Sequence, residues 1–240
     1  MQFRPIVRAT KGIQTSDGAG VRLRRLMGGG GAIPSIDPFL MLDYFDRDNA
    51  RDYIAGFPEH PHRGFETVTY MLNGRMRHRD NHGGEGVIEP GGIQWMTAGR
   101  GLIHSEMPEQ SEGLMRGFQL WVNLPARLKM SEPGYQEHGS QRMPIEDRAN
   151  GVRVKVIAGE TSSGTRGPVT AEATQPIYFD IELPADGEFV EPVGSDRAAF
   201  IVAHDGRIAV GDKTLEAVGL AELGTGDTVR LRAADGPARA

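Results

Sequence analysis

Glycine and proline interrupt this chain so often that little room is left for helices of ordinary length. The 240 residues include 33 glycines and 15 prolines, and short runs rich in Val, Ile, Phe, Tyr and Thr lie between them. One run, Ile177 to Leu183, alternates apolar residues with two acidic ones, Asp180 and Glu182. A period of two is the pattern of a half-buried β-strand. The sequence therefore predicts an all-β fold, a sandwich or barrel with tight turns, and one possible helical turn at 126–130.

Two similar segments predict two lobes. Residues 69–80 place an apolar strand, an Asn73-Gly74 turn and a second strand, and residues 199–212 repeat this order around Asp205-Gly206. Asn-Gly and Asp-Gly favour tight hairpins, so both turns are predicted as hairpins. The polar stretch 130–144 contains a Pro-Gly pair, which favours a boundary there. We expect an N-terminal lobe over 1–130, a linker over 131–144 and a C-terminal lobe over 145–240.

The composition excludes several classes of function. The formal net charge is −5 and the basic residues are scattered, whereas nucleic-acid binding needs a concentrated basic face. The chain has no cysteine, which rules out disulfides, iron–sulfur clusters, thiolate zinc sites and a cysteine nucleophile. No apolar run is long enough for a secretory signal or a membrane span, so we expect a cytoplasmic protein with no membrane partner.

Two pairs of ligand-type residues with the same spacing carry the chemical information. His60 and His62 are two residues apart, and His104 and Glu106 follow further along with the same spacing. Residues two apart on a strand point to the same face. Two such pairs on adjacent inner strands would therefore place three imidazoles and one carboxylate around one point. The alternative, an ordinary polar strand edge, fits poorly because the residues around both pairs are rich in glycine.

The remaining histidines receive a structural interpretation. His78 and His82 flank a turn near the predicted site and are expected at its rim. His138 lies in the predicted linker, and His204 is expected in a strand or turn because no ligand-type partner accompanies it. Four large apolar side chains are expected mainly in the core, although some of them could line a pocket: Trp95, Met96, Phe118 and Trp121.

Three neutral imidazoles and one carboxylate suit divalent iron, manganese, nickel, cobalt or copper. Without thiolates, there is little reason to prefer a structural zinc ion. Four protein ligands on an octahedral ion leave two positions for water, substrate or dioxygen. An open site of this kind is what catalysis requires.

Three long segments also resemble a known family. The segments Asp37 to Phe45, His60 to Gly74 and Gln94 to Pro108 closely resemble the pirin family, and the C-terminal half resembles it only loosely. This resemblance implies a bicupin, with two β-barrel or jelly-roll cupin lobes. It also implies that the N-terminal lobe holds one metal, commonly iron, and we expect the C-terminal lobe to be metal-free.

Carried over residue by residue, the family's ligands fall on His60, His62, His104 and Glu106, in agreement with the spacing. We expect Glu106 to act also as the catalytic proton acceptor. The broader cupin pattern places a glutamate a few residues after the first histidine pair, and Glu66 occupies that position. Counted by alternation, Glu66 shares a face with His60 and His62, so we expect it beside the ligands, holding an imidazole N–H.

The resemblance implies two classes of function. Some bacterial pirins are similar to quercetin 2,3-dioxygenases, which suggests a monomeric enzyme that opens a small aromatic flavonol with O2 and releases CO. Fe(II) is the expected cofactor, with Mn, Ni, Co, Cu or Zn as alternatives. Animal pirins are described as redox-sensitive transcriptional co-regulators, which suggests instead an iron-dependent regulatory protein with a protein partner. A cupin isomerase or sugar-binding module is the third alternative.

Overall fold

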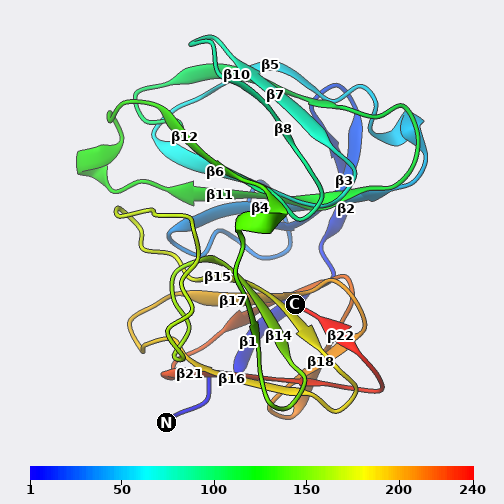
Figure 1. Ribbon diagram of the computed structural model, residues 1–240, viewed down its shortest axis with the longest axis vertical. Coiled ribbons are helices and arrows are strands. Elements are labelled where there is room, and N and C mark those ends of the chain that lie inside the picture. The colour runs from blue at the N-terminus through cyan, green and yellow to red at the C-terminus, as the bar shows by residue number, and fades with distance from the viewer. The chain divides into compact units, whose positions relative to one another are not determined.

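The structure, a computed structural model that describes residues 1–240, consists of short strands and three 3-10 helices (Figure 1). The predicted all-β class is confirmed, and the helical turn expected near residue 126 is the 3-10 helix η2 (Ala126–Leu128). None of the helices is long and apolar enough to cross a membrane. The chain divides into two compact units, one formed by Ile13–Arg142 and the other by Met1–Gly12 together with Met143–Ala240.

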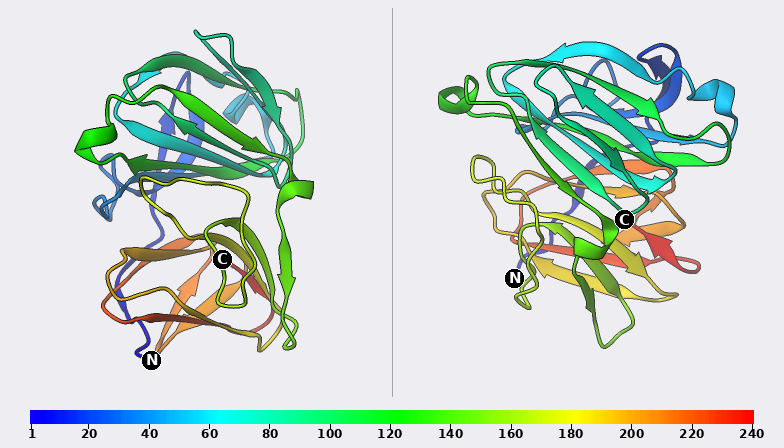
Figure 2. Two further views of the ribbon diagram at one scale, coloured as in Figure 1. Left: turned by 60° about the vertical axis from the view of Figure 1, so that its left-hand side comes forward. Right: turned by 45° about the horizontal axis from the view of Figure 1, so that its top comes forward.

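The first unit, residues 13–142, contains a sheet of seven strands in the order β12-β9-β6-β11-β4-β3-β2 and a sheet of four in the order β5-β10-β7-β8. Figure 2 shows this unit, coloured from blue to green, from two further sides. Consecutive strands often belong to different sheets, as in a jelly roll. The elements in chain order are β2 (Ile13–Asp17), β3 (Val21–Met27), β4 (Phe39–Arg47), η1 (Ala50–Asp52), β5 (Phe57–His62), β6 (Phe65–Asn73), β7 (Met76–Asp80), β8 (Glu85–Ile88), β9 (Ile93–Thr97), β10 (Leu102–Pro108), β11 (Met115–Asn123), η2, β12 (Gly134–His138) and η3 (Ser140–Arg142).

The second unit contains two sheets of four strands, in the orders β13-β14-β15-β22 and β16-β21-β18-β19, and a sheet of three in the order β1-β20-β17. Its core is mainly aliphatic, formed by residues such as Val154, Ile208 and Leu231 around the single buried phenylalanine Phe189. The elements are β1 (Ile6–Thr10), β13 (Ile145–Asp147), β14 (Arg153–Ala158), β15 (Tyr178–Leu183), β16 (Glu188–Pro192), β17 (Ala199–Ala203), β18 (Arg207–Val210), β19 (Lys213–Glu216), β20 (Gly219–Leu223), β21 (Thr228–Ala233) and β22 (Ala238–Arg239).

The division between Arg142 and Met143 falls within the stretch 131–144 expected to be the linker, but two other features differ from the expected lobes. The first twelve residues belong to the second unit, because β1 pairs with β20 and the buried Arg4 donates hydrogen bonds to the backbone oxygens of Gly194 and Gly224. The stretch expected to be a linker contains β12, which pairs with β9 and forms the edge of the seven-stranded sheet. Its Pro-Gly pair marks the start of a strand and not a boundary between lobes.

The Asn73-Gly74 and Asp205-Gly206 turns are not the hairpins that the sequence predicts. The strands on either side of Gly74, β6 and β7, lie in different sheets, and so do β17 and β18 around Gly206. Both glycines have positive φ, +77° and +65°, so the dipeptides do form tight turns. The chain crosses from one sheet to another at each of them, and the repeated segment is therefore a repeated corner of the fold.

Alternation along β6 separates the two faces of the seven-stranded sheet. Thr69 points toward the four-stranded sheet, since its hydroxyl reaches Glu106 on β10. Thr67 and Met71 share this face, and Glu66 and Val68 point to the opposite one. The face with Thr69 is polar around that residue and becomes apolar at Met71, which belongs to a cluster with Met76 and Met115.

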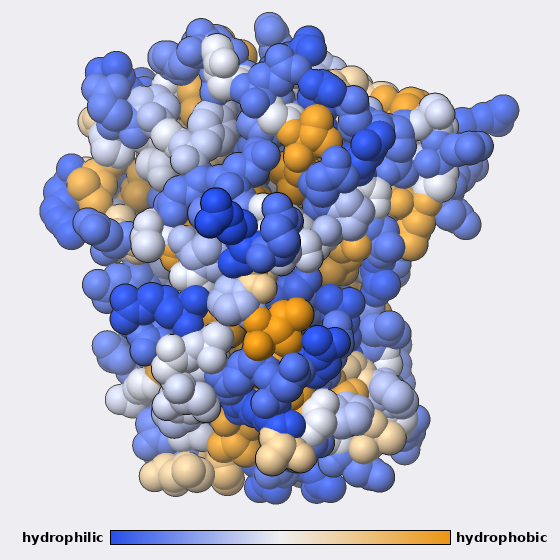
Figure 3. Space-filling view, viewed as in Figure 1, coloured by the Kyte–Doolittle hydropathy of each residue, from blue (hydrophilic) through white to orange (hydrophobic).

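The surface drawn in Figure 3 is mostly hydrophilic, and its hydrophobic residues form separate patches. Exposed large apolar side chains occur in both units, for example Val7 on β1 and Ile103 on β10. Ile103 alternates with buried neighbours along β10, which identifies the outward face of that strand.

Candidate metal centre

The structure brings the two ligand-type pairs together on adjacent strands. β5 and β10 pair antiparallel, with His104 opposite His60 and Leu102 opposite His62. Along β10, His104 and Glu106 are buried and the residue between them is less so, which is the period of two expected from the sequence. Alternation within each strand therefore directs both pairs to the inner face of the four-stranded sheet.

The three imidazoles form one compact cluster. One ring nitrogen from each of His60, His62 and His104 lies within 4.8 Å of the others. The Nε2 atoms of His60 and His104 are 3.0 Å apart. The ring of His62 lies 4.7 Å from that of His60 and 4.9 Å from that of His104, measured between centroids. This spacing allows all three residues to contribute a nitrogen to one ion.

The protonation states of the imidazoles suit a metal site. The Nδ1 atom of His60 lies 2.7 Å from the carbonyl oxygen of Pro58, which can only accept, so Nδ1 donates there and Nε2 is the ring nitrogen that faces His104. Burial lowers the pKa of His62 to about 4 and that of His104 to about 3, and the neighbouring imidazoles add to both shifts. Both side chains are therefore neutral at neutral pH, the form in which histidine binds metals.

The carboxylate of Glu106 lies beside this cluster. Its Oε2 atom is 4.0 Å from Nε2 of His104, and its Oε1 atom accepts a hydrogen bond of 2.8 Å from the hydroxyl of Thr69. The residue is 4% exposed, so the carboxylate is held away from bulk water. Glu106 is not part of the group of three imidazoles whose ring nitrogens lie within 4.8 Å of one another, and that group by itself fits a single divalent metal.

Glu66 is not brought to the imidazoles. Its Oε1 atom accepts a hydrogen bond of 2.8 Å from the hydroxyl of Thr97 on β9, and it lies on the face of β6 opposite to Thr69. The expectation assumed that alternation continues from His62 to Glu66. It does not, because β5 ends at His62, and Gly64, with φ of +79°, turns the chain before β6 begins. Burial raises the pKa of the Glu66 carboxyl.

His78 lies inside the unit and not at the rim where the sequence placed it. It is 4% exposed and stands opposite Glu106 in the pairing of β7 with β10. Its Nε2 atom is 2.6 Å from Oε2 of Glu137 on β12. A Cβ atom at Gly86 would lie only 2.5 Å from that Nε2 atom, so glycine is required there for this pair. Alternation along residues 76–80 is the signal that could have placed His78 on the same buried face as Met76.

Two aromatic side chains adjoin the imidazole of His62. The ring centroid of Trp121 on β11 is 5.3 Å from it and that of Phe65 on β6 is 5.1 Å from it. Both side chains are half-buried, in contrast to Trp95 and Met96, which lie in the core as expected. The Nε1 atom of Trp121 is buried without a hydrogen-bond partner.

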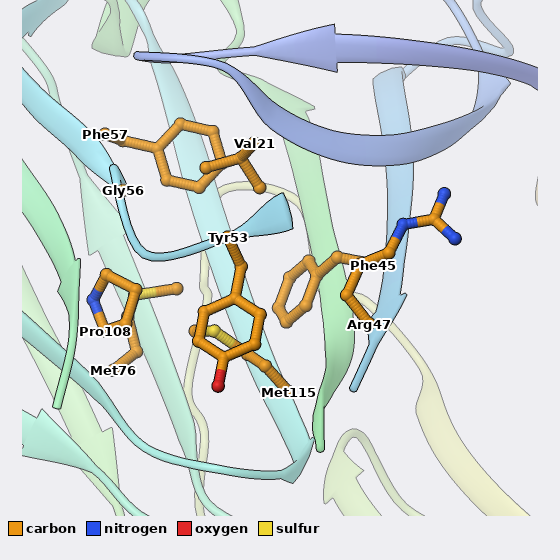
Figure 4. A pocket seen from close by; sticks show the side chains of 9 residues that line it. All are labelled: Val21, Phe45, Arg47, Tyr53, Gly56, Phe57, Met76, Pro108 and Met115. Atoms are coloured by element: carbon orange, nitrogen blue, oxygen red, sulfur yellow. The ribbon is translucent and has the colours of Figure 1, made fainter. Parts of the chain in front are cut away.

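A small apolar pocket in the same unit is separate from the ligand cluster (Figure 4). The volume of this pocket is about 10 Å³, which is room for about one water molecule and too small for an organic substrate. Pro108, one pleat beyond Glu106 on β10, forms part of its wall. The full lining is Val21, Phe45, Arg47, Tyr53, Gly56, Phe57, Met76, Pro108 and Met115.

Comparisons with known proteins support one family. The family model described as pirin matches residues 20–122. A pirin-like protein of Caulobacter vibrioides is 60% identical over 233 residues, which cover 97% of this chain and 84% of the relative. A Pseudomonas aeruginosa protein, named as a candidate quercetin 2,3-dioxygenase, is 50% identical over 90% of this chain and 76% of its own length. The C-terminal half therefore matches this family more closely than the loose resemblance expected from the sequence.

Solved structures agree with the fold. A quercetin 2,3-dioxygenase from Acinetobacter baumannii has a TM-score of 0.87 and 30% identity, covering 99% of this chain and 85% of that one. A bacterial pirin of Escherichia coli, in complex with nickel(II), has a TM-score of 0.74 and 15% identity, covering 100% of this chain and 96% of that one. At that identity the second likeness concerns the fold alone, and together they confirm the predicted bicupin.

Proposed function

The chain belongs to the pirin family, and from this premise we propose that it is a metal-dependent dioxygenase that opens flavonols such as quercetin. The observation that carries the proposal is the convergence of three imidazoles and Glu106 on one inner face. Relatives that bear the name quercetin 2,3-dioxygenase support the reaction class. We propose Fe(II) as the metal, and nickel in a structural neighbour is consistent with a site that accepts other divalent ions.

His60, His62 and His104 would hold the cation through ring nitrogens, and Glu106 through Oε2. When bound, a divalent cation supplies a positive charge that lowers the pKa of a coordinated hydroxyl group. Glu106 would accept the proton of the flavonol 3-hydroxyl at the lone pair of Oε2 that does not face the cation, since Oε1 already accepts from Thr69. Burial of His62, His104 and Glu106 keeps bulk water from competing at these atoms.

Phe65 and Trp121 favour an aromatic substrate. Their ring centroids lie 4.7 Å apart, both rings adjoin His62, and both side chains keep part of their surface accessible. A planar polyphenol could pack on these faces, because aromatic pairs gain energy beyond simple burial.

The reaction needs no external reductant. One flavonol and one O2 give the ring-opened ester and one CO, so two carbon–carbon bonds of the heterocycle break while both oxygen atoms enter the products. The electrons come from the flavonol itself.

The test is turnover after anaerobic loading with Fe(II), measured as oxygen uptake, quercetin loss and CO release. Wild type is expected to consume O2 and quercetin in equal amounts. His62→Ala is expected to lose the activity, and His82→Ala, which removes an exposed histidine outside the cluster, to retain it. Wild-type protein that binds iron but turns over no flavonol would refute the proposed reaction.

A second candidate function is iron-dependent regulation through a protein partner. The observation that favours it is that none of the four predicted ligands lies in the second unit, residues 1–12 and 143–240, which the chemistry does not obviously need. Oxidation of the iron would then change the surface offered to the partner. A set of captured proteins that differs between Fe(II)- and Fe(III)-loaded protein would support this function, and identical sets would contradict it.

A further inference from the structure

A chain of three polar side chains connects the two sheets of the first unit beside the ligand cluster. Thr69 lies on β6 of the seven-stranded sheet, and its hydroxyl is 2.8 Å from Oε1 of Glu106 on β10 of the four-stranded sheet. The same hydroxyl oxygen also lies 2.6 Å from Oε1 of the Gln119 side chain on β11. Thr69 stands opposite Gln119 in the strand pairing, so both backbones hold this arrangement.

The direction of these hydrogen bonds follows from the number of protons. A hydroxyl has one proton and an ionised carboxylate only accepts, so Thr69 donates to Oε1 of Glu106. That proton cannot also serve Oε1 of Gln119, so we assign the Gln119 amide turned by 180°, which exchanges Oε1 and Nε2 and lets the hydroxyl oxygen accept from Nε2. Each of the three groups is paired in this order. The Oε1 atom is thereby occupied, and Oε2 is left facing His104 at 4.0 Å.

We propose that Thr69 is a positioning residue that makes Glu106 a metal ligand through one oxygen only. The inference rests on the proposed metal site and adds a residue that the ligand pattern does not contain. A carboxylate that binds through both oxygens would occupy one more position on the ion. By holding Oε1, Thr69 keeps that position available for substrate or dioxygen.

Thr97 provides a matched control within the same unit. Its hydroxyl donates a hydrogen bond of the same length, 2.8 Å, to a buried glutamate, but that glutamate is Glu66 on the opposite face of β6. Thr69→Val and Thr97→Val therefore remove the same group from the same kind of contact. Only Thr69→Val removes a hydroxyl that is hydrogen-bonded to a predicted metal ligand.

The test is titration of metal-free full-length protein with Co(II), whose visible spectrum reports the number and geometry of its ligands. Thr69→Val is expected to weaken Co(II) binding about 10- to 100-fold and to change the spectrum, because partners that orient metal ligands have effects of that size. Thr69→Ser keeps the hydroxyl and is expected to restore both properties, and Thr97→Val is expected to match wild type.

A wild-type affinity and spectrum in Thr69→Val would overturn the inference, and so would equal effects of Thr69→Val and Thr69→Ser. If Thr69→Val does not fold, Gln119→Leu tests the same chain from its other end. It is expected to weaken Co(II) binding severalfold, and unchanged binding would count against the proposal. Co(II) binding requires no turnover, so the inference still stands if the protein is inactive on flavonols. If His62→Ala binds Co(II) like wild type, the proposed metal site is wrong and the inference fails with it.

Discussion

Replacing Ile6 with alanine tests whether the N-terminal strand is part of the second unit. Ile6 begins β1, is 6% exposed and belongs to the aliphatic core of that unit. It pairs with Leu223 on β20, more than two hundred residues away along the chain. The substitution therefore removes buried side-chain volume from a core whose other members lie in residues 143–240.

The expected cost is about 2–3 kcal/mol. Truncation of a buried isoleucine to alanine costs about 2–5 kcal/mol, and the lower part of that range applies because β1 is an edge strand that can relax. At about 1.4 kcal/mol for each factor of ten, opening of the second unit should become roughly 30- to 140-fold more frequent. Val7→Ala is the control, since Val7 follows on the same strand but is 52% exposed, and it should cost no more than about 0.5 kcal/mol.

Hydrogen exchange followed by mass spectrometry locates the effect. Ile6→Ala should reduce amide protection in peptides from residues 143–240 and leave those from residues 13–142 near wild type. The reasoning fails if protection is lost mainly in residues 13–142, or if Ile6→Ala and Val7→Ala behave alike.

Two further predictions concern the first unit. Gly74→Ala should destabilise the protein by more than about 1 kcal/mol by calorimetry, because φ is +77° and a Cβ atom would lie 3.0 Å from the backbone oxygen of Leu114 and 2.5 Å from Oε1 of Gln110, which already accepts from the Arg75 amide. Gly83→Ala, also at positive φ but with nothing within 4 Å, should cost less, and equal costs would contradict the steric argument. Burial raises the pKa of the Glu66 carboxyl above its ordinary 4.5 in the folded protein. The contribution of Glu66 to stability is therefore fully present below pH 4.5 and is lost as the pH rises through the raised pKa. Glu66→Gln should flatten this decline in denaturant titrations from pH 4 upward, and an unchanged pH profile would refute it.

The ligand pairs were predictable because each lies within one strand. Alternation is reliable inside a single extended segment, so His60 with His62, and His104 with Glu106, could be assigned to common faces from the sequence. The same rule applied within β7 would have placed His78 inward. What the sequence lacked was a reason to prefer the interior over the rim for an isolated histidine.

Other features depend on information that local sequence does not carry. The face on which Glu66 lies could be predicted only if side-chain alternation continued from His62 through Gly64. It does not, because the turn at Gly64, with positive φ, changes which face the following residues point to. The assignments of β1 and β12 depend on their partners β20 and β9, and no local pattern specifies which distant strand an edge strand joins. The Asn73-Gly74 turn was recognisable, but whether the next strand pairs back or crosses to another sheet is decided by packing of the whole unit.

The central claim is that His60, His62, His104 and Glu106 together hold one divalent metal. The most direct measurement is the metal content of purified protein after anaerobic loading with Fe(II) and removal of unbound ion. We predict one iron per chain for wild type and for His82→Ala, and a large loss for His104→Ala with the fold preserved by circular dichroism. One iron per chain in folded His104→Ala would contradict the account.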